Sequence, residues 1–155
     1  MALPDEYATA LDRVLELVVL MNDDMAQSFA RDGLTASRAH LIWVLHHQGP
    51  STQRVLAEAL RVSARNITGL VDALVDTGFV TREPHPTDRR ATLVSLTEHG
   101  SRVTTEMEKG QHEMADLFFS DMSPDELDCF VTGLTGLVNR LRDRLALERP
   151  GAPHV

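Results

Sequence analysis

The sequence predicts a mainly α-helical chain with one small β-hairpin, which places it in the α+β class. Apolar residues recur at steps of three and four over most of the 155 residues, and this is the period of an amphipathic helix. In two short segments, 79–82 and 91–96, the apolar residues instead alternate with polar ones, which predicts a pair of strands. Glycine, serine and threonine signals divide the helical remainder into several segments.

The first two helices are delimited by local signals. Residues 6–31 carry one continuous apolar stripe, and Gly33 is placed to stop that helix. Thr35 then stands where an N-cap is expected, and Gly49-Pro50 breaks the second helical pattern.

The middle of the chain predicts a winged helix-turn-helix. Ser51 is expected to cap a third helix and Ser63 a fourth, with only Arg61-Val62-Ser63 linking them. Two short helices with so short a link are typical of a helix-turn-helix. The two strands follow directly, and the polar segment 83–90 with its two prolines predicts an exposed hairpin tip.

The end of the chain predicts two further amphipathic helices. One begins after Thr97, and Ser123-Pro124-Asp125-Glu126 has the pattern of a capping box at the start of the other. Because these helices and the first one have no evident core of their own, we expect residues 1–33 and 101–147 to pack together and against a second copy. A monomeric helical cap is the alternative. Residues 34–100 are then the winged helix-turn-helix domain and 148–155 a flexible tail.

Composition excludes several classes of protein. Fifteen Lys and Arg against 23 Asp and Glu give a net charge of −8, which excludes a uniformly basic nucleic-acid coat but not a local basic surface. Residues 51–100 are the least acidic third, with six Arg and six acids. The longest apolar run, 17–21, is too short to span a membrane, and the acidic N-terminus is unlike a signal peptide, so we expect a cytoplasmic protein.

The sequence shows no sign of catalytic or metal chemistry. It has no Gly-rich phosphate loop, no nucleophile elbow and no metal-ligand cluster, so we expect no enzyme activity, no cofactor and no metal site. The single cysteine, Cys129, excludes a disulfide framework, and we expect it to be a buried, inert thiol rather than a redox sensor.

Several segments of the middle of the chain form a pattern together. They are Leu56-Ala57-Glu58-Ala59-Leu60, Val62-Ser63, Thr68, Leu70-Val71-Asp72-Ala73-Leu74, Gly78-Phe79-Val80-Thr81-Arg82, Asp88-Arg89-Arg90 and Leu96-Thr97-Glu98-His99-Gly100. In order and spacing these segments resemble the MarR family of winged-helix transcriptional regulators. The resemblance covers about residues 34–101, and its most specific part is the wing motif followed by the last of these segments. It implies a homodimer that binds pseudo-palindromic duplex DNA, usually as a repressor, and that a small ligand or oxidation releases or tightens.

In this fold the fourth helix enters the major groove with its N-terminal turn at the base edges. The outward residues expected there are Ser63, Arg65, Asn66, Thr68 and Gly69. Arg65 matches guanine and Asn66 matches adenine in bidentate geometry, whereas Ser63 is chiefly a cap. The alternative for Arg65 and Asn66 is a solvated helix face.

Two other residues of this helix need a separate explanation. Asp72 would repel phosphates, so we expect it to pair with a nearby arginine. Gly69 lies inside a helix, where glycine costs about 1 kcal/mol relative to alanine. Either another backbone or the DNA comes close to it, or the glycine is simply tolerated.

The wing and the start of the third helix complete the expected DNA contacts. The wing candidates are His85, Thr87, Asp88, Arg89 and Arg90, and the phosphate candidates are Ser51, Thr52, Gln53 and Arg54. The resemblance implies that Arg90 inserts into the minor groove while Asp88 orients the wing. Narrow minor grooves attract arginine through their concentrated negative potential. An ordinary charged turn is the alternative.

A ligand pocket is implied by the resemblance between the first, second and fifth helices. The matching residues are Met21, Met25, His40, Trp43, Val44, Met107, Gln111 and Met114. Methionines beside a tryptophan suit a small apolar or aromatic effector, although plain core packing explains the same residues. For the whole chain, the alternative to a DNA-binding regulator is a winged-helix protein–protein adaptor without DNA binding.

Overall fold

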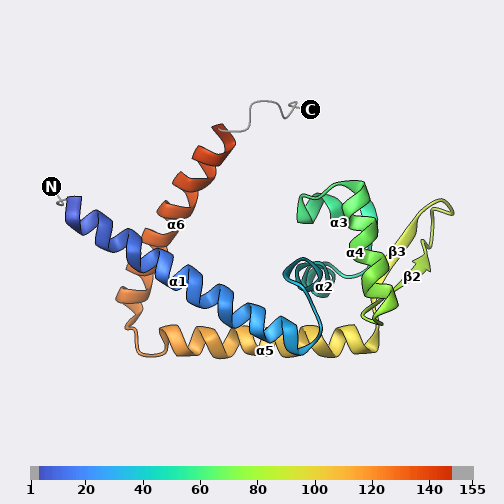
Figure 1. The fold of residues 1–155 in the computed structure, drawn as a ribbon, viewed down its shortest axis with the longest axis horizontal. Helices are drawn as coiled ribbons and strands as arrows, with labels where there is room; N and C mark the ends of the chain where they lie inside the picture. The colour runs from blue at the N-terminus through green and yellow to red at the C-terminus, as the bar shows by residue number, and fades with distance from the viewer. Residues whose placement is uncertain (1–3, 148–155) are drawn as a thin grey trace. The chain divides into compact units, whose positions relative to one another are not determined.

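The computed structural model describes residues 4–147, and the expected tail at 148–155 lies outside them. The helices and strands, in chain order, are α1 (Pro4–Arg31), α2 (Ala36–Gln48), β1 (Ser51–Thr52), α3 (Gln53–Leu60), α4 (Ala64–Asp76), β2 (Val80–Pro84), β3 (Thr92–Leu96), α5 (Glu98–Phe119) and α6 (Pro124–Leu147) (Figure 1). The chain divides into two compact units between Glu108 and Lys109, inside α5. The winged helix-turn-helix predicted from the sequence is confirmed.

Side-chain caps define the helix starts of the first unit. Thr35 caps α2 and Ser63 caps α4, as predicted. In each cap the side-chain hydroxyl accepts the backbone N–H of the residue three positions later in the chain. The prediction for α3 was wrong by one residue, since its cap is Thr52. Ser51 instead forms the short strand β1 opposite Val94, because its backbone pairs with β3.

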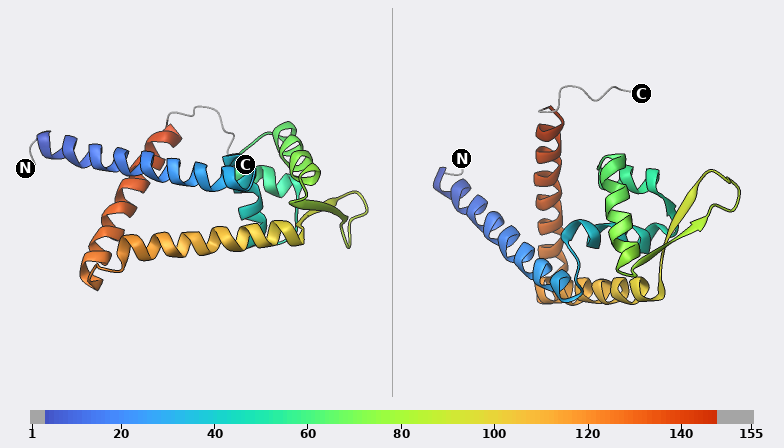
Figure 2. Two further views of the ribbon diagram at one scale, coloured as in Figure 1. Left: turned by 60° about the horizontal axis from the view of Figure 1, so that its bottom comes forward. Right: turned by 45° about the vertical axis from the view of Figure 1, so that its right-hand side comes forward.

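The sheet is antiparallel, with the strand order β1-β3-β2. In the hairpin, Val80 pairs with Leu96 and Pro84 pairs with Thr92, so β2 continues two residues beyond the expected 79–82 segment. The views of Figure 2 show the hairpin extending away from the helices of the first unit. The expected polar tip is therefore shorter than 83–90, but it projects as predicted.

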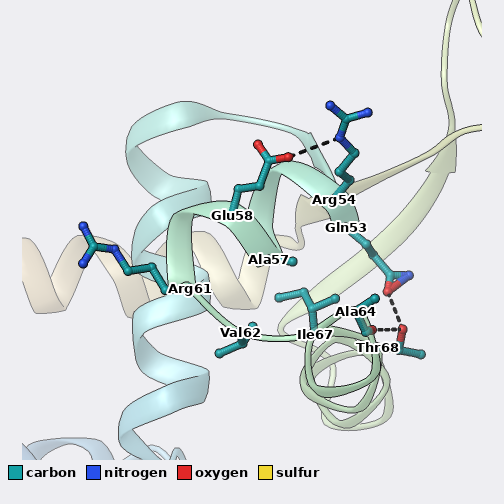
Figure 3. Close-up of a pocket in the computed structure, with 9 residues that line it drawn as sticks. All are labelled: Gln53, Arg54, Ala57, Glu58, Arg61, Val62, Ala64, Ile67 and Thr68. Carbon is teal, nitrogen blue, oxygen red and sulfur yellow. Dashed lines mark hydrogen bonds and ion pairs between the residues drawn. The ribbon is translucent and has the colours of Figure 1, made fainter. Parts of the chain in front are cut away.

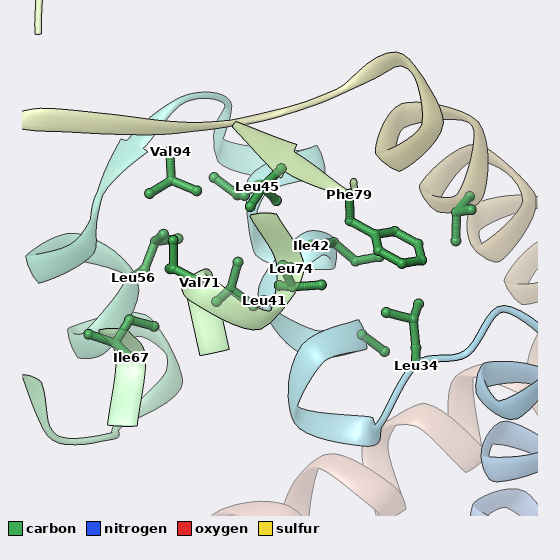
Figure 4. Close-up of a cluster of buried hydrophobic side chains, with 13 residues drawn as sticks. Leu34, Leu41, Ile42, Leu45, Leu56, Ile67, Val71, Leu74, Phe79 and Val94 are labelled. Carbon is green, nitrogen blue, oxygen red and sulfur yellow. The ribbon is translucent and has the colours of Figure 1, made fainter. Parts of the chain in front are cut away.

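The core of the first unit lies where α2, α3, α4 and the sheet meet (Figure 4). Leu41, Leu56, Val71, Leu74 and Val94 have no exposed surface at all. Burying a side chain of this size stabilises the folded state by about 1.5–3 kcal/mol. The core thus fixes α4 and the base of the hairpin relative to each other.

The junction between the hairpin and α5 is held by polar contacts. The Thr97 hydroxyl donates to the Gly78 carbonyl at 2.6 Å and accepts the N–H of Gly100 at 3.0 Å. The Thr97 N–H donates to the Phe79 carbonyl at 3.0 Å. Gly100 is buried here, and a Cβ added to it would lie 2.1 Å from the Phe79 oxygen.

The second unit contains the C-terminal part of α5 and all of α6. The capping box predicted at the start of α6 is confirmed, because the Ser123 N–H and hydroxyl both donate to the Glu126 carboxylate and the Glu126 N–H donates to Ser123. The hydrogen bonds from the backbone and then the hydroxyl of Ser123 lower the pKa of Glu126 from its ordinary value. Cys129 is exposed in the chain, so the expectation of a buried thiol was wrong.

Large apolar side chains are also exposed along two helices. On α1 they include Leu11 and Val18, and on α6 they include Leu134 and Leu141. No helix within residues 4–147 is long and apolar enough to cross a membrane.

Replacing Gly100 tests the tight junction. We expect Gly100→Ala to lower the free energy of unfolding by about 3 kcal/mol, because the new methyl group overlaps a backbone carbonyl that Thr97 holds in place. Urea unfolding of the DNA-free protein at fixed concentration measures this change.

Gly69→Ala is the matched control, since a Cβ there meets nothing within 4 Å. That variant should be as stable as the parent or more stable by up to about 1 kcal/mol. Equal stability of the Gly100 variant and the parent would contradict the tight packing at this junction.

Candidate nucleic-acid interface

The first turn of α4 presents its polar side chains outward. Ser63 serves as the cap, and its hydroxyl accepts the N–H of Asn66 at 3.2 Å. Arg65 and Asn66 are both exposed. Within residues 4–147 neither side chain makes a hydrogen bond or ion pair, so both are free to bind a ligand.

Thr68 connects α4 with α3. Its hydroxyl lies 3.1 Å from Gln53 Oε1 and 2.9 Å from the Ala64 carbonyl, so its single proton is already used. Thr68 can still offer its methyl group and a lone pair. Because Gln53 accepts through Oε1, the amide nitrogen of Gln53 remains available as a donor.

A cavity of about 540 Å³ lies in the angle between α3 and α4 (Figure 3). Gln53, Ala57, Val62, Ile67 and Thr68 are among the residues that line it. Figure 3 shows the Arg54 and Arg61 side chains extending away from it. The cavity is part of the helix-turn-helix surface itself and shares no residue with the expected effector pocket.

The start of α3 keeps three of its four expected phosphate candidates accessible. Thr52 and Gln53 are half-buried and Arg54 is exposed, with its Nε atom 3.2 Å from Glu58. Ser51 differs, because it is buried and its hydroxyl donates to the Gly49 carbonyl at 3.0 Å. We therefore remove Ser51 from the candidate contacts.

The wing tip brings the five expected wing residues together in one turn. His85 is half-buried, while Thr87, Asp88, Arg89 and Arg90 are exposed. Asp88 Oδ1 accepts the backbone N–H of Arg90 at 2.9 Å, so the carboxylate shapes the turn. This geometry is what an orienting role for Asp88 requires.

An ion pair joins the wing to α4. Asp72 binds the guanidinium of Arg82, so the pairing expected for Asp72 is confirmed. Arg82 lies on β2, and the sequence did not identify it as the partner of Asp72. Only the strand register, which places Arg82 opposite Val94, indicates that it faces this part of α4.

The ion pairs leave four of the six arginines in residues 51–100 without an acidic partner. Arg54 pairs with Glu58 and Arg82 with Asp72, so 6 − 2 = 4 remain within the part of the chain that the structure describes. They are Arg61, Arg65, Arg89 and Arg90, and all are exposed. An acidic chain thus presents four arginines that form no ion pair within the described residues.

Arg61 is the member of this set that the sequence did not reveal. It ends α3 with φ at 55°, a left-handed conformation that is uncommon for residues other than glycine. Its position in the three-residue link between the two helices was the signal available.

Gly69 is exposed, and a Cβ added to it would meet no other atom of the described chain within 4 Å. A close approach by another part of the described chain is therefore excluded as the reason for this glycine. The approach of DNA and simple tolerance both remain.

The residues expected to form an effector pocket do not share one environment. Met25 and His40 are exposed, while Met21, Trp43, Val44 and Met107 are half-buried. Val44 and Met107 pack against the core, and the Trp43 ring lies 5.8 Å from that of His46. Gln111 and Met114 belong to the second unit. Across residues 4–147, His, Cys, Asp and Glu form no group of three or more suited to a metal ion.

Comparison with known proteins adds independent evidence. The sequence pattern of the MarR family matches residues 34–92. The transcriptional repressor YetL of Bacillus subtilis is 31% identical over 126 residues, which span 78% of this chain and 74% of YetL.

Solved structures share the fold. RV1404 from Mycobacterium tuberculosis has 26% identity and a TM-score of 0.68, and the match covers 99% of this chain and 100% of that one. Streptococcus pneumoniae FabT, solved in complex with DNA, has 20% identity and a TM-score of 0.75, covering 90% and 97% of the two chains.

Proposed function

Because this chain belongs to the MarR family of DNA-binding transcriptional regulators, we propose that it acts as a homodimeric repressor whose affinity for an operator changes with a small ligand. It is a regulator and not an enzyme. The observation that carries the proposal is the set of four exposed arginines without an acidic partner in the described chain: Arg61, Arg65, Arg89 and Arg90.

The proposed base contacts come from α4. Arg65 can donate two hydrogen bonds to guanine O6 and N7, and Asn66 can bond N6 and N7 of adenine. The Ser63 cap holds the turn that carries them, which supports a fixed direction for both side chains. Gly69, one turn further on, would let the helix lie close to the groove wall.

The proposed backbone contacts come from α3 and the wing. Thr52 and Gln53 stand at the start of α3, where free N–H groups suit a phosphate, and Arg54 and Arg61 add charge. At the wing, Arg90 is proposed to enter a minor groove and Arg89 to bind the neighbouring phosphates.

A second copy is the proposed partner for the apolar surfaces of α1 and α6. Leu11 and Leu141 are each 58% exposed, and they belong to apolar stripes that run along their helices. Stripes of this length are rare on monomers that have no partner. A two-fold dimer would present two recognition helices and two wings, which suits a pseudo-palindromic operator.

Repression and ligand response are further parts of the proposal. Similarity to a protein named as a repressor supports repression. Half-buried Met21, Trp43, Val44 and Met107 support an apolar or aromatic effector, since thioether and indole groups adapt to such molecules.

The arginine set can be tested with the duplex found upstream of the chain's own gene and a scrambled duplex. We expect Arg90→Ala to weaken specific binding by about 1–3 kcal/mol, and Arg61→Ala to reduce the slope of log affinity against log salt by about one. Fluorescence anisotropy at several salt concentrations measures both effects.

Arg102→Ala is the matched control, because Arg102 is exposed on α5 and pairs with Glu98. It should bind like the parent. If no duplex is preferred, even after selection from random DNA, the regulator proposal fails and a protein–protein adaptor becomes the better description.

The dimer surface can be tested on α6. We expect Leu134→Asp to reduce the solution mass from about twice 17.2 kDa towards 17.2 kDa, because it places a charge within the apolar stripe. Light scattering after size exclusion measures the mass. Thr132→Asp adds the same charge on the opposite side of the helix and should leave the dimer intact, whereas a monomeric parent protein would contradict the proposal.

The effector proposal can be tested through Trp43, which is the single tryptophan of the chain. In a panel of monocyclic aromatic compounds, we expect those that change operator affinity also to change Trp43 emission. Met21→Gln should weaken that response at least several-fold, whereas Met122→Gln, at an exposed methionine outside the set, should not. Compounds that alter DNA binding without altering the emission would contradict this location.

A further inference from the structure

His85 stands between two prolines at the end of the wing. Pro84 ends β2 and Pro86 follows His85 directly, so the backbone on both sides of the histidine has little freedom. From this position the imidazole Nδ1 lies 3.2 Å from the backbone nitrogen of Thr87 and 3.1 Å from that of Asp88. The Thr87 hydroxyl lies 3.4 Å from the same atom.

Two side-chain acceptors therefore shape the tip. Nδ1 of His85 receives the N–H groups two and three residues ahead, and the Asp88 carboxylate receives that of Arg90 at 2.9 Å. Main-chain bonds complete the turn, from the His85 N–H to the Ala91 carbonyl at 3.2 Å and from the Ala91 N–H to the Asp88 carbonyl at 3.1 Å.

A nitrogen that accepts two N–H groups carries no proton of its own. We infer that neutral His85, protonated at Nε2, is a positioning residue of the wing: its Nδ1 holds the N–H groups of Thr87 and Asp88 and so sets the direction of Arg89 and Arg90. The inference deepens the proposed function and rests on its assignment of DNA contacts to the wing. It changes the role of His85 from a DNA contact to a support for the contacts.

The charged groups near this end of the hairpin are Glu83, Asp88, Arg89 and Arg90. Asp88 faces the imidazole through its backbone N–H, while its carboxylate binds the Arg90 N–H. Within the described residues no carboxylate or guanidinium pairs with the ring. Among the described residues, His85 thus bonds one charged residue, Asp88, and only through its backbone N–H.

The two roles predict opposite effects of acid. A histidine that touched DNA phosphates would bind them more tightly when protonated, because it would gain a positive charge. A positioning histidine would lose its acceptor on protonation, release the two N–H groups and weaken DNA binding.

Three substitutions separate the acceptor from the rest of the side chain. Asparagine can place its oxygen near the position of Nδ1 and accept the N–H group two residues ahead, as in an Asx turn. Glutamine carries its oxygen one methylene further out, and alanine carries none. We expect His85→Asn to bind the operator duplex like the parent, and His85→Ala and His85→Gln to bind roughly tenfold more weakly.

Hydrogen exchange of the DNA-free protein tests the positioning directly. The Thr87 and Asp88 amides should exchange faster in His85→Ala and His85→Gln than in the parent or in His85→Asn. Lowering the pH should also reduce operator affinity more in the parent than in His85→Asn. That comparison removes the contribution of the other histidines, which both proteins share.

The outcomes separate the positioning role of His85 from the proposed DNA contacts of the wing. Unchanged exchange of both amides in His85→Ala, or tighter binding by the parent than by His85→Asn in acid, overturns the positioning role while leaving the wing contacts intact. Faster exchange with unchanged affinity in His85→Ala overturns the link to DNA binding. If Arg90→Ala then also binds normally, it is the proposed function of the wing that fails.

Discussion

The proposed DNA contacts of α4 and the wing need a fixed geometry between these two elements, and that geometry depends on the packing of the start of α5 against the Phe79 carbonyl. Phe79 is buried at the end of the turn that follows α4, and Thr97 binds both that carbonyl and the one before it. Gly100 allows the helix to approach because it has no Cβ. The base of the hairpin is therefore fixed by α4 on one side and α5 on the other, and the ion pair of Asp72 with Arg82 adds a second connection.

The elements that the sequence predicted correctly are those specified by neighbouring residues. The caps at Thr35 and Ser63 each act within three residues, so their signals are local. Strand β1 escaped prediction because two residues carry no period, and its pairing with β3 decides its conformation. The misplaced cap at Ser51 follows from the same cause.

The residues of the candidate site fall into the same two groups, those predictable from the sequence and those that depend on contacts between distant segments. The pairing of Asp72 was predictable because a carboxylate on a helix proposed to face DNA needs a cation nearby, but its partner Arg82 depends on strand register. The exposure of Cys129 follows from the helical period, because the apolar stripe of α6 runs through Phe130 and Leu134 and Cys129 lies on the other side of the helix. The acceptor role of His85 depends on how the chain turns back at Pro86, which no spacing rule specifies.

The wing also shows how an acidic protein can present positively charged side chains while few carboxylates beside them offset that charge. Arg89 and Arg90 need a fixed backbone, and a fixed tight turn needs side-chain acceptors for its N–H groups. One acceptor is the Asp88 carboxylate, whose negative charge already offsets part of that of the arginines. A second carboxylate at position 85 would make a similar turn but would cancel more of the charge that the wing carries. A neutral imidazole receives both N–H groups without that loss, so in the proposed role His85 shapes the wing and leaves its positive charge for the proposed DNA contacts.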